Sequence, residues 1–249
     1  MIKFFRQIRL NLLSEKKAGK AMSPVGRYML YAIGEIVLVV IGILIALSIN
    51  NWNESNQKGK VLKNIYSVVA DDLRKDSSEV TMVLNFMSVR KKLFDKILND
   101  TLTQKDIDEN QIVLSILNDI RVLNIEKRGY NLLRNFENNS VEKNDSLAFQ
   151  IINFYANAIF YGEKIETMII DDLIKTNDRW KNRDWYAKIM SNKIDETYIN
   201  YMLTDNEYKN LCAFRYTLYY DNYQQTLEQF QKGSLKIMDL IATELETDQ

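Results

Sequence analysis

The chain has no histidine, one cysteine and one proline among its 249 residues, and each scarcity excludes a class of protein. Without histidine it lacks the commonest general base and the usual ligands of zinc and haem. A single cysteine, Cys212, rules out a disulfide within the chain. Because Cys212 lies between Leu211 and Ala213, we expect it to be a small buried apolar side chain.

Helix breakers are equally scarce, since the chain has 8 glycines besides Pro24. Apolar residues recur at helical spacing, and no useful length of sequence alternates between apolar and polar residues as a strand would. Glycine loops that cradle phosphate, nucleophile elbows and metal-ligand clusters are also missing. The sequence therefore predicts an all-α protein with no cofactor, no metal site and no catalytic residues.

The longest apolar segment runs from Tyr28 to Ile49 and contains one charged residue, Glu35. About 20 such residues are needed to cross a hydrocarbon core of about 30 Å, so residues 28–50 are predicted to form a transmembrane helix. The alternative is a cleaved signal peptide, which has an apolar region of about 7–15 residues and a small-residue cleavage site. The following sequence, SINNWNES, offers no such site, which favours a retained signal anchor.

Basic residues before this segment predict its orientation. Residues 1–27 contain seven Lys or Arg and one acid, a sum of +6, so residues 28–249 sum to −6 in a chain of zero net charge. The excess of positive charge holds the N-terminal segment in the cytoplasm and places residues 51–249 outside as a helical domain. An acidic outer domain provides no nucleic-acid interface.

Residues on both sides of the apolar segment are predicted to lie at the membrane surface. Residues 2–13 have apolar residues on one side, as in a short helix lying on the inner surface, although the same residues could serve only as the positive flank. A tryptophan follows the segment, where aromatic rings favour the outer headgroups. The predicted interface residues are Phe4, Phe5, Arg6, Arg9, Arg27 and Trp52.

Glu35 is the strongest candidate for a functional side chain, because an acid within a membrane helix is costly. On a helix it shares a narrow sector with Val39, Gly42 and Ala46, and the small residues would let a second helix approach closely. We therefore predict a helix–helix contact at these four residues. Two alternatives remain: an acid that reaches the inner headgroups, and a ring of Glu35 carboxylates that handles ions or protons.

The outer domain is predicted to be an antiparallel bundle of about four long helices. A stripe of apolar residues predicts the first helix from residue 62 to about 99. Capping-box patterns at Asp108-x-x-Gln111 and Thr204-x-x-Glu207 predict a second, shorter helix over 112–120 and the start of the last helix. A short helical piece is expected over 126–136, and a third long helix over 145–185.

Two acidic pairs and a set of aromatic residues complete the candidates. The pairs Asp71-Asp72 and Asp171-Asp172 are interpreted as solvated acids, and their shared pattern hints at a duplicated hairpin. An enzyme would need Asp72 and Asp172 to converge in a cleft. The aromatic residues are concentrated in the C-terminal part of the chain and are interpreted as part of the core, with the tyrosine hydroxyls at its edge reaching water. A ligand cavity and a contact surface are the alternatives.

The N-terminal block includes YAIGEIVLVVIGILIAL, residues 31–47, and NNWNE, residues 50–54. It resembles a family of uncharacterised single-pass inner-membrane proteins of Gram-negative bacteria, specifically over about the first 55 residues. The resemblance implies a periplasmic location for the outer domain and supplies no catalytic residues.

Together these observations predict a membrane-anchored helical module that acts by binding and is not an enzyme. Its expected partners are the lipid bilayer and either copies of itself or another membrane protein of an envelope complex. A small ion- or proton-coupled transport subunit built on Glu35 is the first alternative, and a periplasmic enzyme that uses carboxylates is the second.

Overall fold

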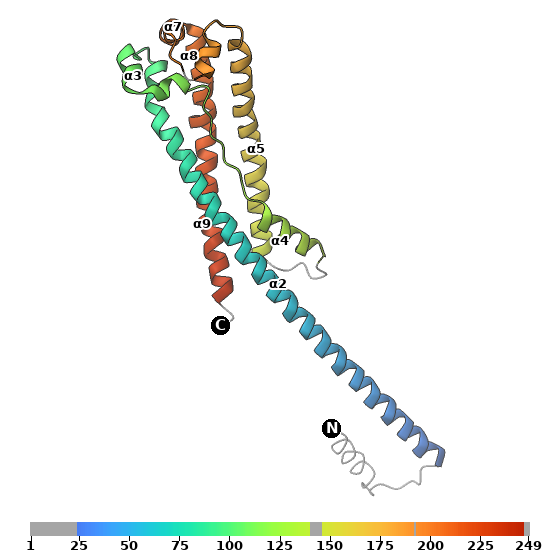
Figure 1. Ribbon diagram of the computed structural model, residues 1–249. Helices are drawn as coiled ribbons and strands as arrows, with labels where there is room; N and C mark the ends of the chain where they lie inside the picture. The colour runs from blue at the N-terminus through green and yellow to red at the C-terminus, as the bar shows by residue number, and fades with distance from the viewer. Residues whose placement is uncertain (1–23, 140–145, 192, 247–249) are drawn as a thin grey trace. The chain divides into compact units, whose positions relative to one another are not determined.

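The structure, a computed structural model, describes residues 24–139, 146–191 and 193–246, and its regular elements there are all helical (Figure 1). This confirms the predicted fold class. The chain divides into two compact units, residues 1–59 and residues 60–249. Residues 1–23, including the predicted surface helix of residues 2–13, lie outside the described residues.

Helix α2 (Pro24–Leu98) runs through 75 residues without a break at Gly59 and contributes to both units. It ends where the sequence predicts, near residues 99 and 100. Asp100 has a left-handed backbone with φ of 55°, and the amide of Thr101 donates to the Lys96 carbonyl at 2.9 Å. This bond caps a free carbonyl of the last turn, as in a helix that ends on glycine.

Three long helical segments form the second unit within the described residues. They are α2 from Lys60 onward, α5 (Ser146–Trp180) and a C-terminal run of α8 (Asn206–Tyr216), the π-helical η2 (Thr217–Tyr223) and α9 (Gln224–Glu246). In Figure 1, α5 runs in the same direction as this part of α2, and α9 runs in the opposite direction. The short helices α6 (Tyr186–Met190) and α7 (Glu196–Thr204) join α5 to α8.

A segment without helix or strand, residues 116–127, takes the place of most of the predicted second helix; it turns at residues 116–118 before it extends. We call it the strap. It follows α3 (Gln104–Glu109) and the 3₁₀ turn η1 (Gln111–Ser115), and it leads into α4 (Arg128–Asn139). The predicted helix over 112–120 is therefore present only as the 3₁₀ turn that ends at Ser115, and the prediction is wrong for residues 116–120.

Distance along α2 explains why the strap is extended. At one end Asp119 pairs with Arg90, and ten residues later Gly129 lies against Val69. Those 21 residues of α2 span about 32 Å at 1.5 Å per residue. Ten residues of helix would cover about 15 Å, whereas an extended chain reaches about 33 Å.

Both predicted capping boxes are displaced. The box before α3 is formed by Thr103 and Asp106, which exchange bonds between side chain and backbone. The cap of α8 is Asp205, whose carboxylate accepts from the Glu207 amide at 2.8 Å, while Thr204 ends α7. In each case a Thr or Asp at another position satisfies the orphan amides of the helix that forms there.

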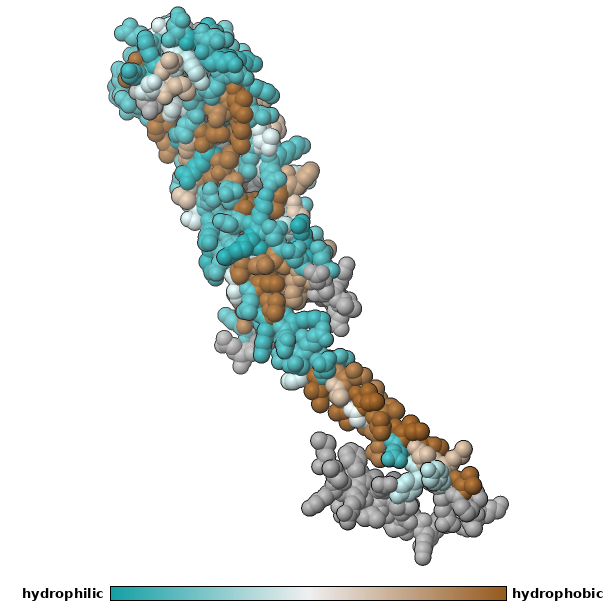
Figure 2. All heavy atoms as spheres, turned by 45° about the vertical axis from the view of Figure 1, so that its right-hand side comes forward, coloured by the Kyte–Doolittle hydropathy of each residue, from teal (hydrophilic) through white to brown (hydrophobic). Residues whose placement is uncertain are grey.

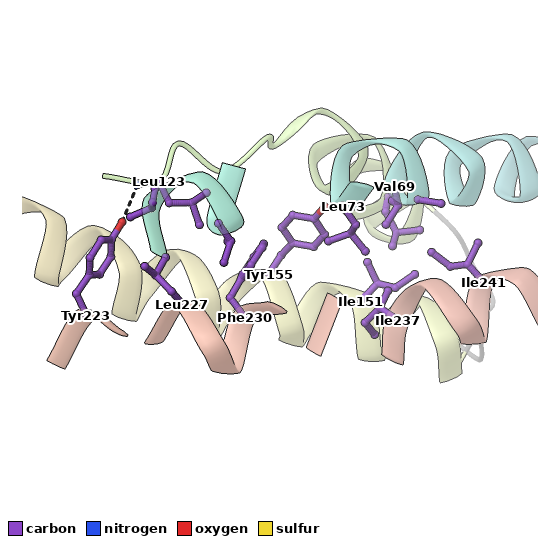
Figure 3. Close-up of a cluster of buried hydrophobic side chains, with 14 of the residues drawn as sticks. Val69, Leu73, Leu123, Ile151, Tyr155, Tyr223, Leu227, Phe230, Ile237 and Ile241 are labelled. Atoms are coloured by element: carbon purple, nitrogen blue, oxygen red, sulfur yellow. Dashed lines mark hydrogen bonds between the residues drawn. The ribbon is translucent and has the colours of Figure 1, made fainter. Parts of the chain in front are cut away.

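The core of the second unit consists of two apolar clusters, and Figure 3 draws the first of them. The first, shown in the figure, joins Val69 and Leu73 of α2 to Ile151 of α5 and Ile237 of α9. The second surrounds Trp180, which is fully buried. Cys212 lies buried in this second cluster, as predicted, and it is a free thiol.

Candidate functional site

The apolar part of α2 is the first candidate site. Every side chain described between Tyr31 and Asn50 is exposed, and a Cβ atom built on Gly42 meets nothing within 4 Å. Figure 2 shows the apolar surface of this segment. By length and composition this helix can cross a membrane, and none of its most apolar 18-residue window is buried.

The predicted contact residues lie together on this exposed helix. Glu35, Val39, Gly42 and Ala46 follow one another at steps of four, three and four residues, which keeps them in one narrow sector. Among the predicted interface residues, Trp52 is exposed. Phe4, Phe5, Arg6 and Arg9 lie outside the described residues, and Arg27 is described only by its backbone in α2.

The acidic pairs behave differently from the prediction, because one member of each is buried. Asp72 is 1% exposed and accepts from the Gly129 amide at 2.7 Å, and Arg128 lies 3.2 Å from its other oxygen. Asp172 accepts from Nε of Arg215 at 2.6 Å. The interpretation as solvated acids holds only for Asp71 and Asp171, and the two buried carboxylates serve separate contacts.

A polar layer lies between the buried residues of the two apolar clusters, and Tyr220 packs against both clusters. The layer consists of Arg90 on α2, Asp172 and Thr176 on α5, and Arg215 on α8, all 8% exposed or less. Arg90 pairs with Asp119 of the strap. Nη1 and Nη2 of Arg215 have no hydrogen-bond partner among the described residues, so this layer is only partly satisfied. Such a layer costs stability compared with an apolar core.

Side chains from other elements hold the strap by its backbone amides. The Arg121 amide donates to the Tyr219 hydroxyl at 3.3 Å, and the Leu123 amide donates to the Tyr223 hydroxyl at 2.6 Å (Figure 3). Asp76 of α2 accepts from the Glu126 amide at 3.0 Å. These bonds replace the ladder that a helix or strand would supply.

Asp76 is a titratable group whose pKa this arrangement changes strongly. It is 1% exposed, and one of its oxygens has no hydrogen-bond partner among the described residues. Burial raises the pKa of Asp76 to about 7. The hydrogen bond from the Glu126 amide lowers the pKa, whereas the negative charges of Asp72, Glu126 and Glu79 raise it. A carboxyl group with such a pKa is neutral in mildly acidic solution and charged above neutrality.

We expect the second unit to be more stable at pH 5.5 than at pH 8.5. The folded state holds the Asp76 proton more tightly than the unfolded chain, in which the pKa of an aspartate side chain is about 3.9. This contribution is therefore lost as the pH rises through 7. The wild type should lose about 2 kcal/mol of stability between pH 5.5 and pH 8.5, which corresponds to a fall in Tm of about 4–8 °C. Asp76→Asn keeps an acceptor for the Glu126 amide and stays neutral, so it should not show this loss.

Thermal unfolding of the wild type and Asp76→Asn at both pH values checks this expectation. The exposed neighbour Asp71→Asn is the matched control and should leave the pH dependence unchanged. An equal pH dependence in wild type and Asp76→Asn would contradict the assignment of the effect to Asp76.

A pocket of about 240 Å³ lies beside the strap, between α5 and the C-terminal run. We call it the strap pocket. Its polar lining includes Glu166 and Tyr223, and the Tyr223 hydroxyl donates to Oε1 of Glu166 at 2.9 Å. Burial raises the pKa of Glu166, while the bond from Tyr223 lowers it. Its apolar walls are formed by Leu123, Ile125, Phe154, Ala158, Leu227 and Phe230.

The π-helical segment η2 brings the strap's tyrosines into position. Tyr219 and Tyr223 are buried and both contact strap amides, while the Tyr220 hydroxyl donates to the Met87 carbonyl at 2.7 Å. π-helical turns are rare and occur often at functional sites. The aromatic residues form a core, as predicted, although these three hydroxyls bond to protein groups.

Sequence reasoning did not select Glu166 or the strap. Glu166 is one of many acids on α5, and only the fold shows that it meets Tyr223. The available signal was the spacing of Tyr216, Tyr219, Tyr220 and Tyr223, which brings several hydroxyls to one side of a buried helix. Within the described residues, no group of three or more Cys, Asp or Glu side chains is arranged to hold a metal ion.

Comparison with known proteins gives a match to a family model over part of the chain. No curated protein and no solved structure matches the chain. Residues 35–121 match a family of unknown function, DUF6090, and this region includes most of α2 and the first part of the strap. Over 87 of its 249 residues, from Glu35 to Arg121, the chain is thus similar to the DUF6090 family of unknown function.

Proposed function

We propose that this protein is a membrane-anchored binding module that acts as an oligomer or as an accessory subunit of an envelope complex. Its N-terminal segment lies in the cytoplasm, residues 28–50 cross the inner membrane, and the helical unit lies in the periplasm. The basic flank of residues 1–27 supports this orientation. The module works by binding and not by catalysis.

The observation that carries the proposal is the uncovered face of Glu35, Val39, Gly42 and Ala46. The chain itself places nothing within 4 Å of a Cβ atom at Gly42, and the neighbouring side chains are exposed. A buried core helix of the same composition would have these positions covered. In a bilayer, small residues allow close helix approach, and an acid favours a protein partner over lipid.

Two substitutions at glycine positions test the proposal. Gly42→Ile adds a branched side chain to the proposed contact face, whereas Gly34→Ile adds the same side chain about 100° away from Glu35. Both positions are equally open, since a Cβ atom at either meets nothing within 4 Å. Gly42→Ile should lower the associated fraction about tenfold, in line with helix contacts of about 1–2 kcal/mol, while Gly34→Ile should leave it unchanged.

The measurement is purification of the full chain from membranes in mild detergent, with mass analysis of everything that co-migrates. Glu35→Ala should weaken association as Gly42→Ile does. Wild-type protein that is monomeric and without companions would overturn the proposal, as would equal behaviour of the two glycine variants. Glu35→Gln retains hydrogen bonding without charge, so preserved association would assign the contact to packing and hydrogen bonds.

A further inference from the structure

We propose that the strap pocket binds a small organic cation, with an ammonium group on the Glu166 carboxylate and a compact apolar body against the pocket walls. The inference concerns residues 60–249 alone and is independent of the association of membrane helices. It stands on the lining of the pocket, the orientation of the Tyr223–Glu166 bond and the charges around it.

The lining favours a ligand that is mostly apolar. Phe154 and Phe230 face the pocket with their ring centroids 5.3 Å apart, and Leu227 and Ile125 add aliphatic surface. Pockets for small molecules typically combine such walls with a few placed polar groups. At about 240 Å³ this pocket admits a body the size of a single ring with a short chain.

At the polar end of the pocket, the Glu166 carboxylate is a hydrogen-bond acceptor that Tyr223 holds in one orientation. The Tyr223 hydroxyl accepts from the Leu123 amide at 2.6 Å, so its own hydrogen is directed to Oε1 of Glu166. Oε2 of Glu166 receives no hydrogen bond within the described part of the chain. A ligand donor is therefore the natural partner of Oε2, and an ionised donor makes the stronger bond.

The charges around Glu166 favour a cation over a neutral donor. Glu163 on α5 and Glu79 on α2 add negative charge, and Lys127 of the strap is the nearby cation. Lys127 is already paired with Glu163 at 2.5 Å. Among the pocket's lining residues, Glu166 is the only acid and there is no Lys or Arg. The aromatic rings of the pocket lining add a favourable surface for an ammonium group.

The test uses phenethylamine as the probe and 2-phenylethanol as its neutral isostere. Isothermal titration of the full chain in mild detergent at pH 7.5 should show saturable one-to-one binding of the amine. The alcohol should bind at least tenfold more weakly. Titration of the amine into detergent alone measures partitioning into micelles, which is subtracted.

Two variants on α5 form a matched pair. Glu166→Gln keeps the acceptor for Tyr223 but loses the charge, and it should weaken amine binding at least tenfold. Asp171→Asn removes an exposed acid of α5 outside the pocket and should change the affinity less than threefold. Tyr223→Phe, which frees Glu166 from its fixed bond, should also weaken binding, and thermal unfolding confirms that each variant is folded.

Three results would overturn the inference. The first is the absence of saturable amine binding by the wild type. The second is equal affinity for amine and alcohol, which would make the pocket a site for neutral apolar molecules. The third is equal loss in Glu166→Gln and Asp171→Asn, which would place the cation on the outer surface of α5.

Discussion

Replacing Arg215 by alanine is expected to lower the free energy of unfolding of the second unit by about 3–5 kcal/mol. Arg215 is fully buried, and its Nε donates to Asp172 at 2.6 Å. Without the guanidinium group, the Asp172 carboxylate stays buried between the two apolar clusters with no opposite charge. Urea unfolding of the full chain in mild detergent, followed by the fluorescence of Trp180 and Trp185, measures the loss.

A double substitution separates the free-energy cost of an unpaired buried charge from the contribution that the ion pair itself makes to the free energy of unfolding. Asp172→Leu with Arg215→Met replaces the pair by apolar side chains, and we expect it to recover most of the loss, because Arg215 leaves two nitrogens unsatisfied. The exposed pair of Arg74 and Asp71 is the control: Arg74→Ala should cost less than about 1 kcal/mol. A double variant no more stable than Arg215→Ala would contradict this account.

Replacing Gly129 by alanine is expected to cost about 2–3 kcal/mol. A Cβ atom there would lie 2.8 Å from the backbone Cα of Val69 and 2.9 Å from its backbone nitrogen. Because these are backbone atoms, the first turn of α4 must move away from α2. That movement also strains the bond from the Gly129 amide to Asp72. The same urea unfolding experiment measures this loss.

Gly59 provides the matched control, since it lies inside α2 with nothing within 4 Å of its Cβ position. Gly59→Ala should be neutral or raise helix stability by up to about 1 kcal/mol. If Gly129→Ala were as well tolerated as Gly59→Ala, the close approach of α4 to α2 would not constrain the fold.

The long helices could be predicted from the sequence because each carries a periodic apolar face over many turns. The stripe that includes Val69, Val80 and Phe94 gave the end of α2 to within two residues. The strap could not be predicted in this way. Its apolar residues, such as Ile116 and Ile120, also have helical spacing, and only the distance from Arg90 to Val69 requires an extended chain.

The burial of charged residues was equally beyond the sequence. Asp71 and Asp72 are adjacent, yet a helix turns about 100° per residue, so one reaches solvent and the other faces α4. Which member of the pair is buried depends on Gly129, which lies 57 positions further along the chain. The same holds for Asp172, whose partner Arg215 lies on another helix. The face of Glu35, by contrast, could be assigned from local spacing alone.

The strap also has a consequence for the order of folding. The hydroxyls that accept hydrogen bonds from the strap's amides belong to Tyr219 and Tyr223, which lie 98 and 100 positions further along the chain than the donors. Contacts of such high sequence separation are slow to form, because a long loop must close before they exist. During synthesis the strap leaves the ribosome well before Tyr219 and Tyr223, so its amides remain bonded to water until the C-terminal run has docked. Protection of the Arg121 and Leu123 amides from hydrogen exchange therefore marks the completion of the fold and not its beginning.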